Sequence, residues 1–246
     1  MRNDRKEKAK QHYIFMNYQY KNEINFSIKN SKIYTKNNVF NENKNNNYNT
    51  SFEILDVGTS DALNNISDGK IGLLNFASFK NPGGGFLKGS LAQEEALCHD
   101  SILYNVLEKF LDFYDYNNKH SNKGMYLDRA IYSPNIYFST QDKFANVITC
   151  AAPNYKAGKK NNISKEQNTK YLRSRINFIL NIAEDNNIDC LILGAFGCGV
   201  FEQDPNEVAS IFLQECSNRN FKKIIFAIPD KNSYNYKCFN SFIENL

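Results

Sequence analysis

The chain has 246 residues, 41% hydrophobic and 14% aromatic, which is enough to bury the core of one domain with additional segments. Thirty basic and twenty-six acidic side chains give a formal net charge of +4, which argues against a dedicated nucleic-acid-binding protein but permits a polyanionic ligand. No apolar run approaches the ~20 residues of a membrane span, and residues 1–10 lack a secretory signal, so we expect an intracellular, cytoplasmic protein with no membrane partner.

The cysteines are scattered and do not have the spacing of a metal site. They form no CxxC pair and no Cys/His cluster suited to zinc. We interpret them as reduced thiols of the core and expect neither a metal nor another cofactor. The six positions are Cys98, Cys150, Cys190, Cys198, Cys216 and Cys238.

The first fifty residues are rich in asparagine and lysine and include an asparagine run at residues 41–47. This composition predicts an accessory or partly disordered segment, although the aromatic residues at positions 13–20 could form one helix that packs on the body. Compositional drift in an AT-rich genome explains the asparagines equally well. We therefore divide the chain into an accessory segment, residues 1–50, and a main domain, residues 51–246.

Within the main domain, short apolar runs alternate with longer segments of helical periodicity. We expect strands at residues 71–76, 146–151, 190–194 and 223–228. We expect helices at residues 94–114, 165–185 and 206–215, with a terminal helix beyond residue 230 that packs on the sheet. This alternation predicts a layered α/β domain with ligands at the loops that leave the carboxyl ends of the strands.

A glycine-rich loop follows the first of these strands. Gly83, Gly84 and Gly85 come shortly after the strand end at Asn75 and precede Phe86. Without Cβ atoms, their backbone N–H groups can approach phosphate or ribose oxygens closely. A flexible surface turn explains three glycines equally well, because the sequence is neither a Walker loop nor a dinucleotide-binding fingerprint.

Two adjacent acids follow this loop after a seven-residue spacer, in the sequence Gln93-Glu94-Glu95. Ser90 and Gln93 fit a capping box, which predicts a helix with Ser90 as its N-cap and Gln93 chiefly as a capping residue. Acids near a helix N-terminus are also favoured by the helix dipole. Beside an anion-binding loop, however, the two carboxylates can form a site that moves protons.

A second glycine-rich loop follows the most apolar strand. Its residues, at positions 194–201, contain Gly197 and Gly199, and Asp204-Pro205 then opens the next helix. A strand, a glycine turn and a helix N-terminus together suit a phosphate group. A tight turn alone needs fewer glycines, so two such loops predict a site that holds a diphosphate from both sides.

Taken together, these residues resemble the signature of poly(ADP-ribose) glycohydrolases, particularly the bacterial type. The three glycines, the spacer and the Gln-Glu-Glu sequence are joined by blocks at residues 75–78, 147–154 and 194–201 in that family's order. The resemblance covers roughly residues 52–230. It implies a macrodomain-like fold of three layers, with a mixed β-sheet between helices and an N-terminal helical extension. It also implies hydrolysis of ribose–ribose O-glycosidic bonds in poly(ADP-ribose) by a monomer, with ADP-ribose as the product.

The resemblance further implies roles for individual residues. Glu95 corresponds to the general acid/base that protonates the leaving ribose oxygen and then activates water. Glu94 corresponds to the residue that orients the ribose, and Asn75 to the one that hydrogen-bonds the distal ribose. The remaining positions expected to bind substrate are Gly83, Gly84, Gly85, Phe86, Gln93, Gly197, Cys198, Gly199, Val200 and Phe201. The residue that recognises adenine is not assigned, either to Asp56 or to Asp61.

Two other functions fit the same motifs. The first is removal of ADP-ribose from modified protein or nucleic acid, which uses the same chemistry on another acceptor. The second is a macrodomain that binds ADP-ribose without hydrolysing it. Such a binding module does not need the acid pair, so the intact Glu94 and Glu95 favour an enzyme.

Overall fold

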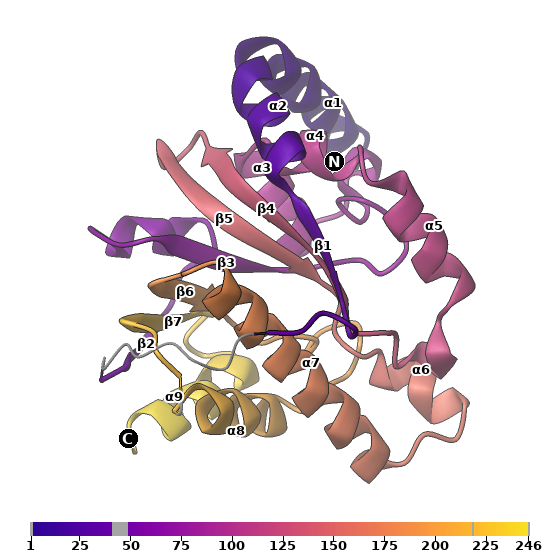
Figure 1. Ribbon diagram of the computed structural model, residues 1–246, viewed down its shortest axis with the longest axis vertical. Helices are drawn as coiled ribbons and strands as arrows, with labels where there is room; N and C mark the ends of the chain where they lie inside the picture. Colours follow the sequence, from indigo (N-terminus) through magenta and orange to yellow (C-terminus); the bar gives the residue numbers. More distant parts are fainter. Residues whose placement is uncertain (1, 41–48, 218, 246) are drawn as a thin grey trace.

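The fold is a mixed β-sheet with helices on both faces (Figure 1), seen in a computed structural model that describes residues 2–40, 49–217 and 219–245. Within these residues the sheet has seven strands in the order β1-β4-β5-β3-β6-β7-β2. The strands are β1 Lys32–Thr35, β2 Ser51–Leu55, β3 Ile71–Phe76, β4 Arg129–Phe138, β5 Lys143–Cys150, β6 Cys190–Leu193 and β7 Lys223–Ala227. Neighbours from β5 to β2 run parallel, whereas β4 is antiparallel to both β5 and β1.

Helices cover each face of the sheet over a separate apolar core (Figure 1). The first core lies beneath α7 Lys165–Asp185, α8 Pro205–Cys216 and α9 Tyr234–Ile243. The second lies beneath α1 Arg2–Gln19, α2 Lys21–Asn30, α3 Gln93–Asp100, α4 Leu103–Leu107 and α5 Leu111–Lys119. The helix α6 Tyr155–Lys160 and the short turns η1 Asp61–Asn65, η2 Phe86–Lys88 and η3 Asn122–Gly124 complete the described elements.

The strands expected from the apolar runs are confirmed by β3, β5, β6 and β7, with ends that differ by up to three residues. The sequence analysis did not identify β1, β2 or β4. The strand β3 lies between β5 and β6 and is parallel to both. Its carboxyl end therefore opens at the centre of the sheet edge, where the topology of α/β domains favours a ligand site.

The helices at residues 165–185 and 206–215 are confirmed by α7 and α8. A capping box begins α7, because Ser164 accepts from the Gln167 backbone N–H at 3.2 Å while Gln167 accepts from the Ser164 N–H at 2.9 Å. Asp204 caps α8 by accepting from the Asn206 N–H at 3.0 Å. The expected terminal helix is α9, whose Phe239 is buried, although Tyr234 is largely exposed.

The prediction of one helix over residues 94–114 is wrong, because three helices, α3, α4 and α5, occupy this segment. The first break lies at Ser101, whose backbone is extended. Ser101 forms a bridge with Phe138 at the end of β4, and the Ile102 N–H donates to the Tyr137 carbonyl at 3.2 Å. The Ser101 hydroxyl then accepts from the N–H of Leu103, the first residue of α4, at 3.1 Å. Pairing with the sheet therefore interrupts a continuous helical pattern.

The N-terminal segment is ordered over residues 2–40, so the expectation of partial disorder is wrong for that range. It forms two helices and the edge strand β1, which pairs with β4. Ala9, Met16 and Ile24 are buried in the second core. The alternative of a helix that packs on the body is confirmed, whereas the asparagine run at residues 41–47 lies outside the described residues.

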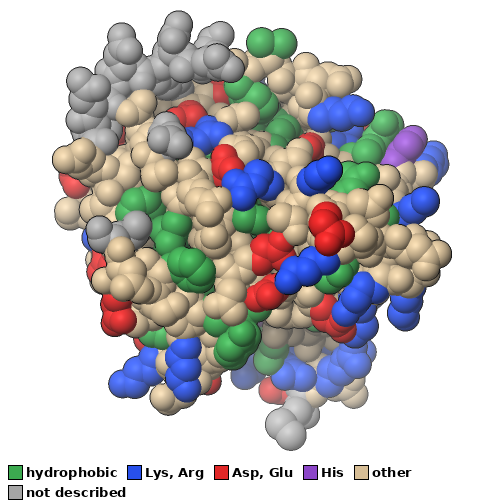
Figure 2. Space-filling view, turned by 90° about the horizontal axis from the view of Figure 1, so that it is seen from below, with side chains coloured by type: hydrophobic (Ala, Val, Ile, Leu, Met, Phe, Trp, Pro, Cys, Tyr) green, Lys and Arg blue, Asp and Glu red, His purple; other side chains and the backbone are tan. Residues whose placement is uncertain are grey.

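Charges of both signs are interspersed on the face seen in Figure 2, in keeping with the small net charge. None of the helices that the structure describes is both long and apolar enough to cross a membrane. The described cysteines are free thiols, and only Cys198 is not fully buried. The interpretation of core thiols is therefore confirmed for the other five.

Candidate active site

The end of β3 brings a buried amide to the acid pair. Asn75 is fully buried, and its Nδ2 donates to Glu94 Oε1 at 3.2 Å and to Thr149 Oγ1 at 3.3 Å. Thr149 lies directly beside Asn75 in the register of β3 and β5. The Asn75 Oδ1 atom is buried and has no hydrogen-bond partner among the described residues. Such an atom is costly unless a ligand or water fills the acceptor position.

Both acids lie in the first turn of α3 and are buried, with exposed fractions of 3% for Glu94 and 7% for Glu95. Glu94 Oε2 accepts from the Ser78 backbone N–H at 2.6 Å. Glu95 Oε1 accepts from the Gly85 N–H at 2.7 Å, and its Oε2 accepts from the Ala92 N–H at 3.0 Å. The two neighbouring carboxylates are thus held by different backbone groups and have different positions relative to the loop.

The predicted N-cap at Ser90 is wrong, because α3 begins at Gln93 and its N-cap is Ala92. Alanine has no side-chain acceptor, so the N-terminus relies on Glu95, which accepts from the N-cap N–H. One oxygen of Glu95 therefore fixes the helix end while the other fixes the glycine loop. Glu95 thus caps α3 and holds the glycine loop at the same time.

Gln93 does not act chiefly as a cap, in contrast to the sequence interpretation. Its Oε1 accepts from the Phe76 N–H at 2.8 Å, and its Nε2 donates to the Leu74 carbonyl at 2.8 Å and to Thr59 Oγ1 at 3.1 Å. The side chain thus occupies the hydrogen-bonding positions of a neighbouring strand at the end of β3. It fixes α3, and with it both acids, to the sheet.

The glycine loop passes directly over the carboxylates, and its glycines are required by this close approach. A Cβ atom on Gly84 would lie 2.6 Å from Glu95 Oε1 and 2.9 Å from Glu94 Oε2. A Cβ on Gly83 would lie 2.5 Å from the Tyr104 ring. Gly83 and Gly84 also have positive φ angles of +62° and +58°, which side chains disfavour. The loop is therefore a built part of the site and not a flexible surface turn.

Phe86 follows the glycines and anchors the loop from beneath. Its ring is 1% exposed and lies against His99 and Tyr104, with ring centroids 4.7 and 5.0 Å away, and against His12 of α1 at 6.2 Å. The side chain therefore faces the second core.

Burial raises the pKa of Glu94 from its usual 4.5 to about 8, and the charge of Glu95 acts in the same direction. The Ser78 N–H and the Asn75 amide oppose this shift because they stabilise the ionised form. A carboxyl group with this pKa is largely neutral at pH 7. It can then donate one hydrogen bond as well as accept others, which suits contact with a hydroxyl group.

The second glycine loop lies at the end of β6, next to β3 in the sheet. Gly197 has a φ angle of +77°, and a Cβ there would lie 2.8 Å from Ala152 Cβ. Gly199 has open space around it, and Val200 is 77% exposed. The backbone N–H groups of these last two residues make no hydrogen bond within the part of the chain that the structure describes. They are available to an anion.

Cys198 lies in the same loop but does not have the properties of a nucleophile. Burial raises the pKa of its thiol well above the usual range, and the charge of Asp204 acts in the same direction. Cys198 therefore remains a neutral thiol within the loop.

Aromatic side chains connect the two loops. Tyr126 stacks on Phe79, with ring centroids 3.8 Å apart, and meets Phe201 edge-on at 6.0 Å. Phe79 belongs to the first loop and Phe201 follows the second. Tyr126 has a φ angle of +59°, which is unusual for an aromatic residue and fixes its ring in this position. No short motif in the sequence identified Tyr126 as part of the site.

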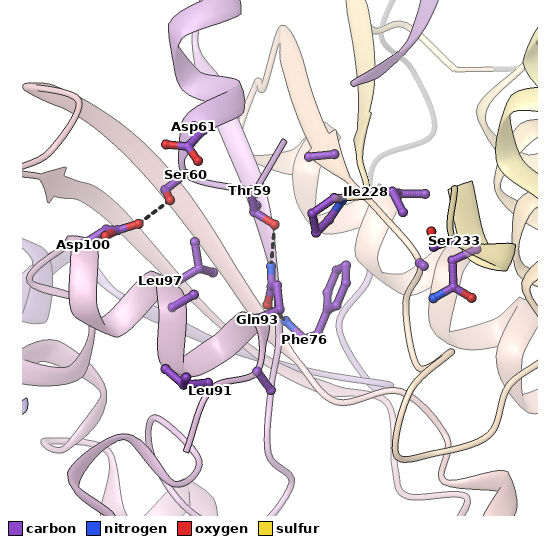
Figure 3. Close-up of a pocket in the computed structure, with 17 residues that line it drawn as sticks. Thr59, Ser60, Asp61, Phe76, Leu91, Gln93, Leu97, Asp100, Ile228 and Ser233 are labelled. Atoms are coloured by element: carbon purple, nitrogen blue, oxygen red, sulfur yellow. Dashed lines mark hydrogen bonds between the residues drawn. The ribbon is translucent and has the colours of Figure 1, made fainter. Parts of the chain in front are cut away.

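A cavity of about 510 Å³ lies beside the N-terminus of α3 (Figure 3). Apolar side chains from three different elements line it, among them Phe76, Leu97 and Ile228, and polar groups lie at its edge. Of the acids, Asp61 and Asp100 line the cavity, whereas Asp56 does not. Sequence reasoning also missed Ser233 and Asn235, which line the cavity from the start of α9.

The acid pair itself does not line this cavity, although Ala92, Gln93 and Ala96 of the same segment do. The cavity and the carboxylates are therefore adjacent compartments separated by the first turn of α3. Among the residues described, no group of three or more His, Cys, Asp or Glu side chains is arranged to hold a metal ion.

The most similar solved structures include poly(ADP-ribose) glycohydrolases of two bacteria. The enzyme from Thermomonospora curvata is 24% identical, with a TM-score of 0.86 and coverage of 98% of this chain and 99% of that chain. The same organism's enzyme bound to the inhibitor ADP-HPD has a TM-score of 0.83 at 24% identity, with coverage of 98% and 100%. The Deinococcus radiodurans enzyme in complex with ADP-ribose is 29% identical, with a TM-score of 0.77 and coverage of 91% and 98%.

These likenesses confirm the predicted macrodomain-like fold. No curated protein sequence matches the chain. The sequence does match the family described as microbial-type PARG, catalytic domain, over residues 6–140, which is more than half of the chain. That range contains Asn75, the first glycine loop and both acids, whereas the second loop lies beyond it. The chain belongs to the microbial-type poly(ADP-ribose) glycohydrolase family.

Proposed function

We propose that this protein hydrolyses the ribose–ribose O-glycosidic bonds of poly(ADP-ribose) and releases ADP-ribose, with Glu95 as the general acid/base. Members of its family are O-glycosyl hydrolases that act on this polymer. The observation that carries the role of Glu95 is its buried carboxylate, held against the glycine loop by the Gly85 N–H at 2.7 Å. The bare Cα of Gly84 lets the loop backbone lie directly against that carboxylate, since a Cβ there would be 2.6 Å from Glu95 Oε1.

Glycosidic cleavage passes through a transition state in which positive charge develops at the anomeric carbon, while the departing oxygen needs a proton. Glu95 gives this proton to the leaving ribose oxygen and then removes a proton from the attacking water. Glu94, with its raised pKa, holds a ribose hydroxyl as a neutral acid. Asn75 offers its unpaired Oδ1 to the same sugar.

The second glycine loop is proposed to bind the diphosphate of the same ADP-ribose unit. The free N–H groups of Gly199 and Val200 support this role, because two neighbouring backbone donors can hold phosphate oxygens. Gly197, Cys198 and Phe201 shape the loop around them.

We further propose that the 510 Å³ cavity takes the adenosine half of the substrate. A volume of this order suits a ligand of nucleoside size, and its apolar walls suit a base. Two acids line it, Asp61 and Asp100, and we assign the contact with the base to Asp61 because Asp100 already accepts from the Ser60 hydroxyl. If this is correct, Asp61→Asn raises KM more than it lowers kcat, measured by release of ADP-ribose.

The decisive experiment compares wild type with Glu95→Gln on poly(ADP-ribose), on singly ADP-ribosylated protein and on ADP-ribosylated DNA. Loss of general acid catalysis is expected to lower the release of ADP-ribose from the polymer by about 100-fold or more. Glutamine can still accept from an N-cap N–H, as Gln167 does in α7, so the fold is retained. The exposed first-turn acid of α7 provides a matched control, Glu166→Gln.

Unchanged activity of Glu95→Gln would exclude the proposed mechanism. If neither protein releases ADP-ribose but both bind it in calorimetry, the alternative of a binding module is correct. Release only from singly modified protein or DNA would favour an ADP-ribosyl hydrolase with another acceptor. The proposal also retains a monomeric, intracellular enzyme of the cytoplasm, which gel filtration and cell fractionation test.

A further inference from the structure

The first turn of α1 lies directly against the loop that holds Glu95. A Cβ atom on Gly89 would lie 2.9 Å from the Arg2 carbonyl oxygen and 3.2 Å from Arg5 Cβ. Gly89 has a φ angle of +72°, and the Arg2 Nε donates to the Lys88 carbonyl at 3.3 Å. Because backbone meets backbone here, the N-terminal helix is seated on the active-site loop by close contact.

One compact turn connects this contact with Glu95. The Gly85 carbonyl accepts from the Lys88 N–H at 2.9 Å and from the Ser90 N–H at 3.1 Å, while the Gly85 N–H donates to Glu95. The turn therefore has Glu95 on one side and α1 on the other. Cations carried by the turn and by the start of α1 are therefore connected to the proposed general acid through this one turn.

Four such cations form what we call the N-terminal cationic cluster: Arg2, Arg5 and Lys6 of α1, and Lys88 of the turn. Among the described residues, no carboxylate lies within 4.0 Å of any of them. The Nε atom of Arg5 is also buried and makes no hydrogen bond to any described residue. An uncompensated group of cations with an unused donor favours an anionic ligand.

The lysines near the second glycine loop differ from this cluster. Lys156 and Lys159 both form ion pairs with Glu202, at 3.0 and 2.9 Å. Their charge is largely compensated by that acid within the protein. These two lysines therefore have an acidic partner within the protein, whereas the cations of the N-terminal cationic cluster have none among the residues that the structure describes.

We propose that the N-terminal cationic cluster binds the diphosphate of the leaving group. This leaving group is the ADP-ribose unit on the other side of the scissile bond from the ADP-ribose that is released. This inference rests on the proposed function of Glu95. The oxygen that Glu95 protonates belongs to a ribose, and that ribose carries its own 5′-diphosphate. That diphosphate is one ribose away from the oxygen that Glu95 protonates, and the cluster lies at the turn that Glu95 holds. Guanidinium groups suit it because they can bind phosphate through two donors at once.

The test compares two substrates: poly(ADP-ribose), and ADP-ribose joined at its anomeric carbon to a neutral phenol. The second substrate has the scissile bond but no second diphosphate. In the double variant Arg5→Gln/Lys88→Gln, we expect the ratio of kcat/KM for polymer to that for the phenol to fall about fivefold, mainly through KM. The slope of log KM against log salt for polymer should also fall by about 1, because fewer counterions are exchanged.

Two further variants separate recognition from general charge and from folding. Lys10→Gln removes a cation of the same helix that lies outside the cluster. Arg5→Lys/Lys88→Arg keeps both charges and should recover most of the polymer preference. An unchanged ratio in the double variant, or an equal fall in Lys10→Gln, would overturn the proposal.

Direct binding keeps this inference separate from the proposed function. If wild type releases no ADP-ribose from the polymer, the catalytic proposal fails. Fluorescence anisotropy with end-labelled poly(ADP-ribose) still tests the cluster, because the double variant should then bind about fivefold more weakly than Lys10→Gln. Equal affinity of the two variants would contradict the cluster as a binding site.

Discussion

The backbone of Gly84 lies against the carboxylates of both Glu94 and Glu95. Its missing Cβ leaves room for Glu95 Oε1 and Glu94 Oε2, which would lie 2.6 and 2.9 Å from such an atom. Any side chain there would push one carboxylate away from the backbone donors that hold it. The positive φ angle of +58° adds a second, independent requirement for glycine.

We therefore predict that Gly84→Ala damages catalysis more than folding. The left-handed conformation and the close contact should cost about 2 kcal/mol of unfolding free energy. Displacement of the carboxylates should lower kcat by about 100-fold. Chemical denaturation and polymer hydrolysis measure the two effects.

The stability control for this variant is Gly199→Ala, since a Cβ at Gly199 has no neighbour within 4 Å. Its unfolding free energy should change by less than about 0.5 kcal/mol. A Gly84→Ala protein with wild-type kcat would show that the close approach to the carboxylates has no catalytic consequence.

The raised pKa of Glu94 predicts a pH-dependent cost to stability. This carboxyl group ionises near 4.5 in the unfolded chain and near 8 in the folded protein. Between these values the folded protein holds a proton that the unfolded chain has lost, so the free energy of unfolding falls as pH rises. Below that window the group is neutral in both states, and above it the cost is constant.

Glu94→Gln removes this titration. The melting temperature of the variant minus that of wild type should therefore increase from about pH 5 to about pH 8 and then level off. Scanning calorimetry in a series of buffers measures it, with the exposed acid variant Glu166→Gln as the control. A difference that stays constant across the range would contradict the raised pKa.

At the scale of elements, α3 shows why the position of the site in the chain could be predicted from the sequence, whereas its hydrogen bonds could not. The signature from the glycines to Glu95 identified the segment, and the resemblance identified the family. The true N-cap, Ala92, has no side-chain acceptor, so no capping pattern could reveal it. The attachment of Gln93 to β3 depends on Phe76 and Leu74, which lie 17 and 19 residues earlier, and local patterns do not specify it.

For the N-terminal helix α1, the sequence composition was misleading, because it indicated an accessory segment where the structure has a helix packed on the body. Most of its residues are polar, yet Ala9 and Met16 are buried against the second core. Met16 has an exposed fraction of 1%, whereas Tyr18, two positions along, is 85% exposed. A narrow apolar stripe is sufficient to hold α1 on the second core, because the helix also contacts the active-site loop at Gly89.

This packing predicts a large difference between two neighbouring substitutions. Met16→Ala leaves a cavity in the second core and should cost about 3 kcal/mol of unfolding free energy. Tyr18→Ala removes an exposed ring and should cost less than about 0.5 kcal/mol. Urea denaturation measures both, and equal values for the two variants would show that α1 is not docked in solution.

At the scale of the whole molecule, the sheet separates two cores, and the N-terminal segment contributes to both. Met16 and Ile24 lie in the core on one face, and Tyr34 of β1 lies in the core on the other. The parallel strands β3, β5, β6 and β7 could be predicted because they carry the apolar runs of buried strands in α/β domains. The parallel edge strand β2 could not, because it is only partly buried and contains Ser51 and Glu53. The edge strand β1 could not, because it is short and half exposed and depends on β4 for its register.

The last prediction concerns removal of this segment. A protein that lacks residues 1–45 loses α1, α2 and β1, which exposes the second core and leaves β4 without its outer neighbour. We expect the urea midpoint to fall well below that of Met16→Ala, and the shortened protein to aggregate through the exposed edge. Activity should fall as well, because the active-site loop loses its contact with the first turn of α1. An unchanged midpoint, measured by circular dichroism alongside the full-length protein, would restore the interpretation of residues 1–50 as a dispensable accessory.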